Sequence, residues 1–590
     1  MRFSKRLKAG LCASALTLAA CGGGGGGPAT PTPTGGGGGG TGGTPPPPPP
    51  VLATELESKT EASGFLASMT FGPTVGDVDD AVGQDAAQLL RAEMDKPRRA
   101  YLDRTRNLYE SYGDSGRRNT AHRTIFWKDM IDRDDQLRQR MVFALSQIIV
   151  ISDRELGDRP TSMAHYMDIL SENAFGNYRD LLEDITYSPA MGDYLTYRGN
   201  RKGDERTGRT PDENYAREIM QLFSIGLVEL NMDGTTRLDS QGLTIDTYTN
   251  EDIVGLARVF TGLDLEEKPD RGYDPVHPRR SRPMAIYPDR HSELEKSFLG
   301  GTIPAGTGAA ESIDQALDII FEHPNVAPFI SRQLIQRFTA SSPDPAYVER
   351  VARVFEAGTF RAEDGTVFGD GRRGDLAATL AAILLDESQH RSDDTLRNST
   401  DLGKVREPVL NFVHWARAFD VSPVSPENEW DLLYNAGNTF DRIGQMPLSS
   451  PTVFNFYRPG YIAPGTTSGD RGYTAPEFQL ILSGNRTGYA NMMTFYAFDN
   501  TGSPNNDVES FKPDYTDELA LVEDPEALAD HLDELVLGGR MSDATRNVIV
   551  NGVPAIEIRT NTPENEETDR FRRAAYAVTV AITAPEYIVR

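Results

Sequence analysis

Apolar residues recur at helical spacing through most of the chain after Val51, in segments separated by stretches rich in proline and glycine. One face of the helix predicted over residues 136–151 carries Leu137, Met141, Leu145 and Ile148. Arg138 and Arg140 are predicted to face away from it. Further helices are predicted over residues 250–260, 311–321, 327–338, 347–356, 375–385, 524–537 and 569–584. The pattern therefore predicts a mainly α, large multi-helical globular body.

Strand-like alternation is scarce, so at most a short β-hairpin is expected. It is predicted at residues 228–238, where two β-prone segments flank the turn dipeptide Asp233-Gly234. Long loops are predicted at residues 199–211, 264–293, 418–442 and 457–475. Loops of this length in compact proteins are commonly functional or mobile.

The N-terminus has the layout of a secretory signal peptide over residues 1–20, with basic residues followed by a short apolar stretch. That stretch is too short to span a bilayer. The sequence Leu18-Ala19-Ala20-Cys21 resembles the lipobox of bacterial lipoprotein precursors. The resemblance implies cleavage before Cys21 and a lipid on its sulfur, and Gly22 in place of aspartate implies the outer membrane. The alternative is a plain secretory signal that contains a cysteine.

Residues 21–50 combine glycine tracts, Pro/Thr alternation and a final proline tract. This composition cannot build a core, and it is typical of a tether with a reach on the order of 30 Å. The expected organisation is a lipoprotein signal over residues 1–20, a lipidated cysteine with a Gly/Pro-rich tether over 21–50, and a helical domain over 51–590.

Composition and charge narrow the classes of partner. The chain has 590 residues, with 38% hydrophobic and 25% charged residues, as expected of a globular protein. Its formal net charge is −27, and it becomes about −31 when the four basic residues of the signal are removed, which argues against nucleic acid as a partner. The only cysteines are Cys12 and Cys21, so the mature domain has no thiol for disulfides, thiolate metal sites or iron–sulfur clusters.

Several long motifs occur in one order: PDENYAREIMQLFSIGLVELN, YTNEDIVGLARVFTGL, HSELEKSFLGG, HPNVAPFISRQLIQRF, GDLAATLAAILLD, GKVREPVL, PTVFNFYRPGY and the final AAYAVTVAITAPEYIVR. In these motifs the chain resembles the bacterial domain of unknown function 1800 family over almost all of residues 60–590. The resemblance implies an exported, mostly helical protein whose gene often lies beside one for the exported domain of unknown function 1501 family. It implies no reaction.

The strongest local candidate for a functional site is a helix predicted to begin near Pro211. Thr210 and Glu213 are predicted to form its capping box. Its apolar side carries Tyr215, Ala216, Ile219, Met220, Leu222 and Phe223, and its polar side carries Glu213, Asn214, Arg217, Glu218, Gln221 and Ser224. Three interpretations stay open for the polar side: a functional site, a buried structural network, or an ordinary solvated surface.

His291 and Lys296 lie in a segment that also matches the family. The histidine is a candidate metal ligand or proton carrier, and Glu213 or Glu218 would complete the site in space. The alternative is that it is a hydrogen-bonded structural histidine. No metal identity and no cofactor follow from the sequence. His323 precedes a predicted helix, and a structural role is favoured for it.

Weaker signals favour structural explanations. Glu387 and His390 have di-iron spacing without the second pair that such a site needs. The segment from Glu229 imitates an EF-hand loop but has Ser240 where a glutamate is required, so a hairpin turn explains it better. Asp375, within an Arg-Gly-Asp tripeptide, is predicted to cap a helix.

Standard catalytic motifs of zincins, α/β-hydrolases and P-loop proteins are absent from the sequence, although a Ser/His/Asp set assembled from distant positions stays open. Two functions therefore compete. The first is a lipid-anchored binding or assembly protein of the cell envelope, acting with an exported partner of the 1501 family, or on an envelope or extracellular polymer. The second is an extracytoplasmic hydrolytic or metal-assisted enzyme. In the enzyme, Glu213, Arg217, Glu218 and His291 would be catalytic, with Asn214, Gln221 and Lys296 binding substrate.

Overall fold

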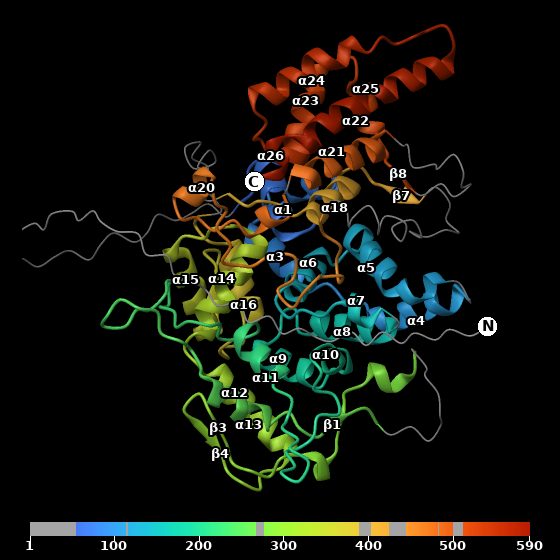
Figure 1. Ribbon diagram of the computed structural model, residues 1–590. Coiled ribbons are helices and arrows are strands. Elements are labelled where there is room, and N and C mark those ends of the chain that lie inside the picture. The colour runs from blue at the N-terminus through green and yellow to red at the C-terminus, as the bar shows by residue number, and fades with distance from the viewer. Residues whose placement is uncertain are drawn as a thin grey trace, which may run out of the picture. The chain divides into compact units, whose positions relative to one another are not determined.

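The computed structural model describes residues 55–590 except 114–115, 158, 267–275, 389–402, 424–443, 482 and 499–510. The described chain is mainly helical, as predicted (Figure 1). The signal peptide, Cys21, the tether and His390 lie outside the described residues.

The helices of the N-terminal half are α1 (Lys59–Met69), α2 (Val75–Ala81), α3 (Ala86–Met94), α4 (Tyr101–Ser111), η1 (Gly116–Thr120), α5 (Ala121–Asp132), α6 (Gln136–Ser146), α7 (Asp153–Leu156), α8 (Pro160–Glu172), α9 (Tyr178–Thr186), α10 (Pro189–Tyr194), α11 (Asn214–Gln221), α12 (Asn250–Ala257), η2 (Pro278–Ser281) and η3 (Pro288–Arg290). Those that follow are α13 (Ala309–Phe321), α14 (Val326–Phe338), α15 (Pro345–Ala357), α16 (Leu376–Leu384), α18 (Pro408–Ala418), α20 (Thr467–Asp470), η5 (Pro476–Gln479), α21 (Ser483–Ala497), α22 (Thr516–Leu521), α23 (Pro525–Leu532), η6 (Asp533–Leu537), α24 (Asp543–Ala555), α25 (Pro563–Thr583) and α26 (Pro585–Ile588).

The strands form four antiparallel two-stranded sheets in the described chain. They are β1 (Leu263–Asp264) with β2 (Ala285–Ile286), β3 (Lys296–Phe298) with β4 (Gly301–Ile303), β5 (Phe360–Arg361) with β6 (Val367–Phe368), and β7 (Ser422–Pro423) with β8 (Phe511–Lys512). The hairpin predicted around Asp233-Gly234 is also present, since Leu230 pairs with Thr236 in an antiparallel bridge.

Local sequence explains where several helices begin. Asp375 caps α16 as predicted, because its carboxylate accepts the backbone N–H of Ala378 at 2.8 Å. Thr249 and Asp252 form a capping box at the start of α12. α25 begins with Pro563 directly after its N-cap Thr562. These caps satisfy N–H groups that have no partner within the helix.

Helix α6 is enclosed on more sides than its periodicity indicates. Arg140, predicted to face away from the apolar stripe, is only 2% exposed. Its guanidinium lies 4.9 Å from the centre of the Phe338 ring and donates to the Arg337 carbonyl. The prediction for Arg140 is therefore wrong, because α14 packs against α6 and covers that side as well.

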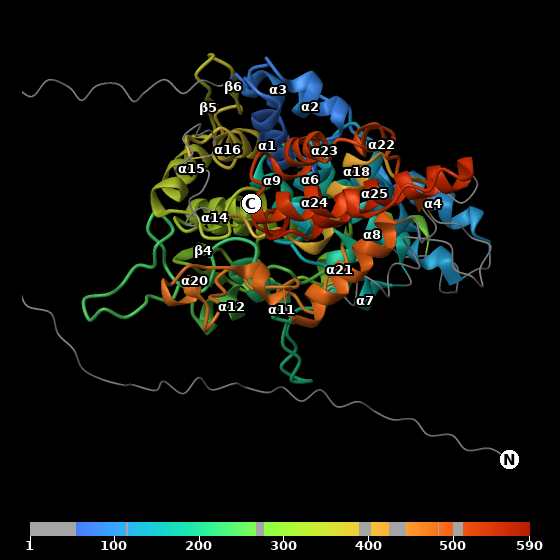
Figure 2. The ribbon, with the colours of Figure 1, turned by 90° about the horizontal axis from the view of Figure 1, so that it is seen from above.

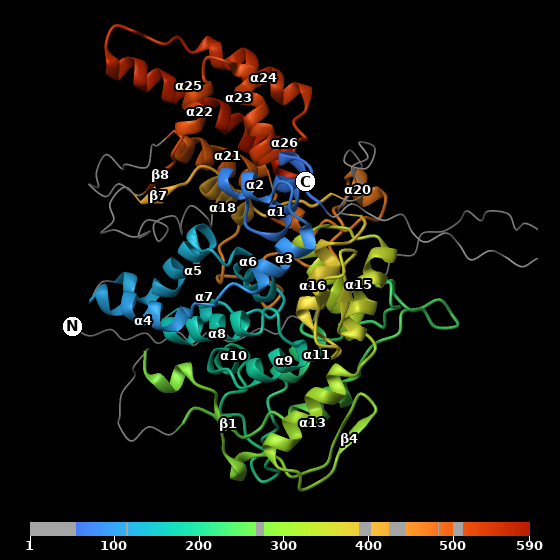
Figure 3. The ribbon, with the colours of Figure 1, turned by 180° about the vertical axis from the view of Figure 1, so that it is seen from behind.

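Segments from opposite ends of the described chain pack together. The Ser63 hydroxyl of α1 donates to the Leu535 carbonyl of η6 at 3.1 Å, and Arg590 donates to the Gly64 carbonyl. Figures 1 and 3 show α1 beside α26 and the C-terminus, and Figure 2 shows α24 and α25 side by side. Within the described residues, no helix has both the length and the apolar character needed to cross a bilayer.

Candidate functional site

Helix α11 carries most of the predicted site residues, and it begins later than predicted. Its first residue is Asn214, and the N-cap Glu213 makes no side-chain capping bond. Asp212 takes this role instead, because its carboxylate accepts the Asn214 N–H at 2.9 Å and its own N–H donates to the Asn200 side chain at 3.0 Å. The predicted Thr210/Glu213 capping box is therefore wrong.

The apolar side of α11 packs as its periodicity predicts. Its buried residues are Tyr215, Ala216, Ile219 and Met220, with Phe223 following. The Tyr215 ring stacks on Tyr197 at 4.1 Å between centroids and meets Phe260 edge-on at 4.7 Å. This aromatic packing fixes the helix against the loop before it and against the segment after α12.

Glu218 is the unusual group on the polar side. It is only 8% exposed, and its Oε2 atom is buried without a hydrogen-bond partner. Burial raises its pKa from 4.5 to about 7, while the charge of Arg217 opposes the shift. A carboxyl group with this pKa can hold or release a proton near neutral pH.

The other polar residues of α11 are more ordinary. Arg217 and Glu213 lie 3.6 Å apart as an exposed i,i+4 ion pair, of little energetic weight. The Gln221 side chain accepts a hydrogen bond from the Tyr248 hydroxyl at 3.0 Å. Asn214 is half-buried at the start of the helix.

His291 is buried in a second cluster beside β1 and β3. Its Nδ1 lies 2.9 Å from the Thr261 carbonyl, which can only accept, so Nδ1 carries the proton. Its Nε2 is therefore the unprotonated nitrogen, and it is buried without a hydrogen-bond partner. Burial, together with the charge of Lys296, lowers the pKa of His291 and favours the neutral ring.

Lys296 is fully buried on β3, and its ammonium donates to the Leu294 carbonyl at 3.3 Å. Burial lowers its pKa, and the nearby Arg258 adds to the effect. Neither His291 nor Lys296 has a hydrogen bond or ion pair with α11 in the described part of the molecule. The connection is indirect, because Phe260 contacts Tyr215 and the adjacent Thr261 holds His291.

Metal binding by His291 would need further ligands. Across the described ranges, no group of three or more His, Cys, Asp or Glu side chains is arranged to hold a metal ion. Among the described residues, His291 therefore lacks the partner ligands that a metal site needs, and its Nε2 atom is buried without a hydrogen-bond partner.

A serine, a histidine and an aspartate do meet between α5, α7 and the segment before α20. His122 Nε2 lies 3.2 Å from the Asp153 carboxylate, which also accepts from Arg123 and from the Ser449 hydroxyl. Burial alone would raise the pKa of Asp153, but the bonds from His122 and Arg123 lower it to about 2. In a nucleophilic triad the histidine stands between serine and aspartate. Here the aspartate does, so Ser449 is not activated.

A buried polar network joins three of the sequence motifs. Glu407, with no exposed surface, accepts from the Tyr457 hydroxyl at 2.9 Å, from the Gln147 amide at 2.6 Å and from Gln445. Arg337 adds a bond of 3.4 Å to the Gln147 carbonyl. Sequence reasoning missed this network, although the charged residues within GKVREPVL were its available signal.

The minor candidates have structural roles. The ring of His323 accepts the Asn325 N–H at 3.2 Å where the chain enters α14, as predicted. The segment that imitates an EF-hand is a hairpin, in which Asp233 accepts the Thr235 N–H at 2.9 Å. Glu387 pairs with Arg350 at 3.4 Å.

These features define a mainly α-helical protein with a deeply buried polar interior and one perturbed carboxyl on α11. The chain matches the family described as protein of unknown function (DUF1800) over residues 64–589, and it belongs to that family. The description assigns no reaction. No curated protein and no solved structure shows a significant match to the chain.

Proposed function

We propose that the protein is a lipid-anchored binding or assembly component of the outer membrane, which acts with an exported partner of the domain of unknown function 1501 family. The lipobox at Cys21 and the tether over residues 21–50 support the anchor. The observation that carries the binding role is an exposed apolar arm over residues 227–246, directly after α11.

The arm is a long irregular hairpin. Bridges pair Val228 with Asp246, Leu230 with Thr236, and Leu238 with Thr244. It exposes three leucines, with 57% of Leu227, 57% of Leu238 and 61% of Leu243 accessible. Figures 1 and 2 show it as the green loop that extends away from the neighbouring helices. Exposed apolar side chains gathered on one element are typical of protein interaction sites.

The base of the arm is held firmly. Asn325 accepts the Leu230 N–H at 2.9 Å and donates to the carbonyls of Ile225 and Val228 at 2.8 and 2.7 Å. At the tip, the Asp239 carboxylate accepts the N–H groups of Gln241 and Leu243 at 2.8 and 2.9 Å. A preorganised arm loses little conformational entropy when it binds, which favours recognition of a protein surface.

Site-specific photo-crosslinking in living cells tests this role. A photoreactive amino acid replaces Leu243, and a second strain carries it at Val548, which is 48% exposed on α24. We expect a crosslinked band that contains the 1501-family protein from position 243 only. Equal crosslinking from both positions, or none from position 243, would reject the arm as the contact.

Glu218 supports a second candidate function, an extracytoplasmic hydrolytic or metal-assisted enzyme. A buried carboxyl with a pKa of about 7 and a free Oε2 atom is suited to general acid–base catalysis. Glu213 and Arg217 would then act with Glu218 in catalysis, and Gln221 would bind substrate on the same helix face. His291 would have to reach the substrate from the adjacent segment.

This enzyme is tested with envelope extracts as the source of substrates. Wild type and Glu218→Gln are incubated with the extract, and the products are compared by mass spectrometry. A product made only by wild type, with a rate that follows an ionisation near pH 7, supports the enzyme. Identical product profiles from wild type and Glu218→Gln would reject the enzyme, and the binding role would be the only candidate function left.

A further inference from the structure

A small cavity lies between α18, α21 and the C-terminal segment, and it shares no residue with α11 or the arm. Its volume is about 90 Å³. A buried water needs roughly 10–15 Å³ on this measure, so the cavity has room for an oxyanion group and a few carbon atoms. Most of its wall is apolar, with Leu480, Ile481 and Ile588 among the lining residues.

The charged groups that line this cavity are both arginines, and no aspartate or glutamate is among the described lining residues. Arg406 is 5% exposed and directly precedes Glu407, the N-cap of α18. It donates to the Leu410 carbonyl at 3.3 Å, lies 2.8 Å from His414 Nδ1, and stacks over the Tyr587 ring at 5.1 Å. All these partners are uncharged or neutral, since burial lowers the pKa of His414.

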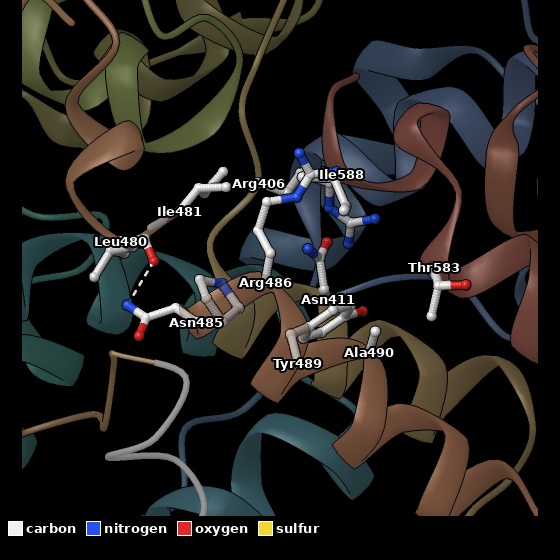
Figure 4. A pocket seen from close by; sticks show the side chains of 11 residues that line it. Arg406, Asn411, Leu480, Ile481, Asn485, Arg486, Tyr489, Ala490, Thr583 and Ile588 are labelled. Carbon is white, nitrogen blue, oxygen red and sulfur yellow. Dashed lines mark hydrogen bonds between the residues drawn. The ribbon is translucent and has the colours of Figure 1, made fainter. Parts of the chain in front are cut away.

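Arg486 approaches the same cavity from α21. Within the described part of the chain it has neither an ion pair nor a hydrogen bond of its side chain. Figure 4 shows the side chains of Arg486, Arg406 and Asn411 turned toward one another. Arg406 is buried without an acid among the described lining residues, whereas Arg486 is exposed, so a bound anion would give the buried Arg406 guanidinium a counter-ion.

Asn411 provides an independent sign of a ligand. It is 2% exposed, its Oδ1 atom is buried without a partner, and its side chain points into the cavity (Figure 4). Buried amide oxygens are almost always hydrogen-bonded, and this one can only accept, so it indicates a missing partner that carries a hydrogen-bond donor. Asn485, in contrast, is already used, because its amide donates to the Leu480 carbonyl at 2.8 Å.

We infer that this cavity is a binding site for a small molecule that joins an oxyanion, a carboxylate or a phosphate, to a short apolar group. Arg406 and Arg486 would clamp the oxyanion, since the fork of a guanidinium matches the oxygens of both groups. Asn411 Oδ1 can only accept a hydrogen bond, so it would bond a protonated oxygen of the head group, such as the P–OH of a phosphate monoanion. Leu480, Ile481 and Ile588 would surround the apolar part, which fits the usual make-up of ligand pockets.

Isothermal titration calorimetry tests the site on the full chain carrying Cys21→Ser, which removes the proposed lipid and the need for detergent. The probes are butyl phosphate, butyrate and the uncharged butanol. The buffer is Tris chloride, because sulfonate and carboxylate buffers would compete. We expect butyl phosphate or butyrate to bind with one-to-one stoichiometry, and butanol not to bind. Which anion binds better distinguishes a phosphate site from a carboxylate site.

Variants locate the binding. Arg486→Gln should weaken it by about tenfold or more, which is the usual effect of losing a charged hydrogen bond. Arg486→Lys should retain part of the affinity, because lysine keeps the charge and loses the fork. Arg206→Gln, which removes an arginine whose side chain is 85% exposed on another loop, is the matched control. Arg486 makes no contact that folding requires among the described residues, so loss of structure is not expected.

Three results would overturn the inference. These are no heat of binding for either anion at about 10 mM, butanol binding as tightly as the anions, or an unchanged affinity in Arg486→Gln. Failure here would leave the arm and the proposed assembly role untouched, since they share no residues with the cavity.

Discussion

Replacing Glu218 by glutamine should stabilise the protein at neutral and alkaline pH. The carboxyl is buried beside α11, and burial raises its pKa from 4.5 to about 7. Glutamine has nearly the same shape and carries no charge. The substitution therefore removes the cost of ionising this position while it keeps the packing of α11.

The size of the effect follows from the pKa shift. Below pH 4.5 the carboxyl is protonated in the folded and the unfolded chain, so the shift has no effect on stability. Between pH 4.5 and about 7 the unfolded chain loses the proton while the folded chain keeps it, so the folded state loses stability as pH rises. The full loss corresponds to about 3 kcal/mol at most.

Unfolding by urea at a series of pH values measures this difference. The free energy of unfolding of Glu218→Gln should match that of wild type at the acidic end of the pH series. It should exceed that of wild type by about 2–3 kcal/mol at about pH 8. Glu213→Gln removes a carboxylate that is 39% exposed in the same helix and controls for the loss of one charge. A stability difference between Glu218→Gln and wild type that does not change with pH would refute the reasoning.

Three further predictions concern other parts of the chain. Cys21→Ser should release the protein from the membrane fraction, as fractionation would show; unchanged fractionation would refute the lipid anchor. Elemental analysis of wild type and His291→Ala should give the same metal content, because His291 Nε2 has no neighbouring ligand among the described residues; metal lost from the variant alone would identify a metal site. Glu407→Gln should destabilise the fold by about 2–4 kcal/mol in urea unfolding, because it removes the anion near the buried Arg140 and weakens the hydrogen bonds that Glu407 accepts; an unchanged midpoint would show that the network carries little energy.

Helical periodicity was sufficient to predict much of the fold. The apolar face of α11 and the helices α13 to α16 follow from spacing alone, because each helix must bury one continuous stripe. Asp375 was equally predictable, since an acidic residue directly before an apolar run is a common helix cap.

Buried charge was the part that sequence could not predict. Arg140 was predicted to face away from the apolar stripe, and no role was predicted for Glu407, because charged side chains are rarely buried without partners. Their partners, Arg337 and Tyr457, come from segments far apart in the chain, and only the folded structure brings them together. The start of α11 was missed for a similar reason, since Asp212 is positioned by Asn200 across a loop.

The same limit applies to the candidate site. The sequence identified Glu218 as one of several polar residues on a helix face, but its perturbed pKa depends on how deeply its neighbours bury it. The cavity at Arg406 and Arg486 had no local signature, because its walls come from α18, α21 and the C-terminal segment.

Affinity purification of the tagged full chain from its native envelope, in mild detergent, tests the central claim most directly. The assembly role predicts that the 1501-family protein is recovered with it in near-equal amount. The Leu238→Ser/Leu243→Ser variant should lose that partner while it remains in the membrane fraction. Recovery of the tagged protein alone from wild-type envelopes would contradict the account.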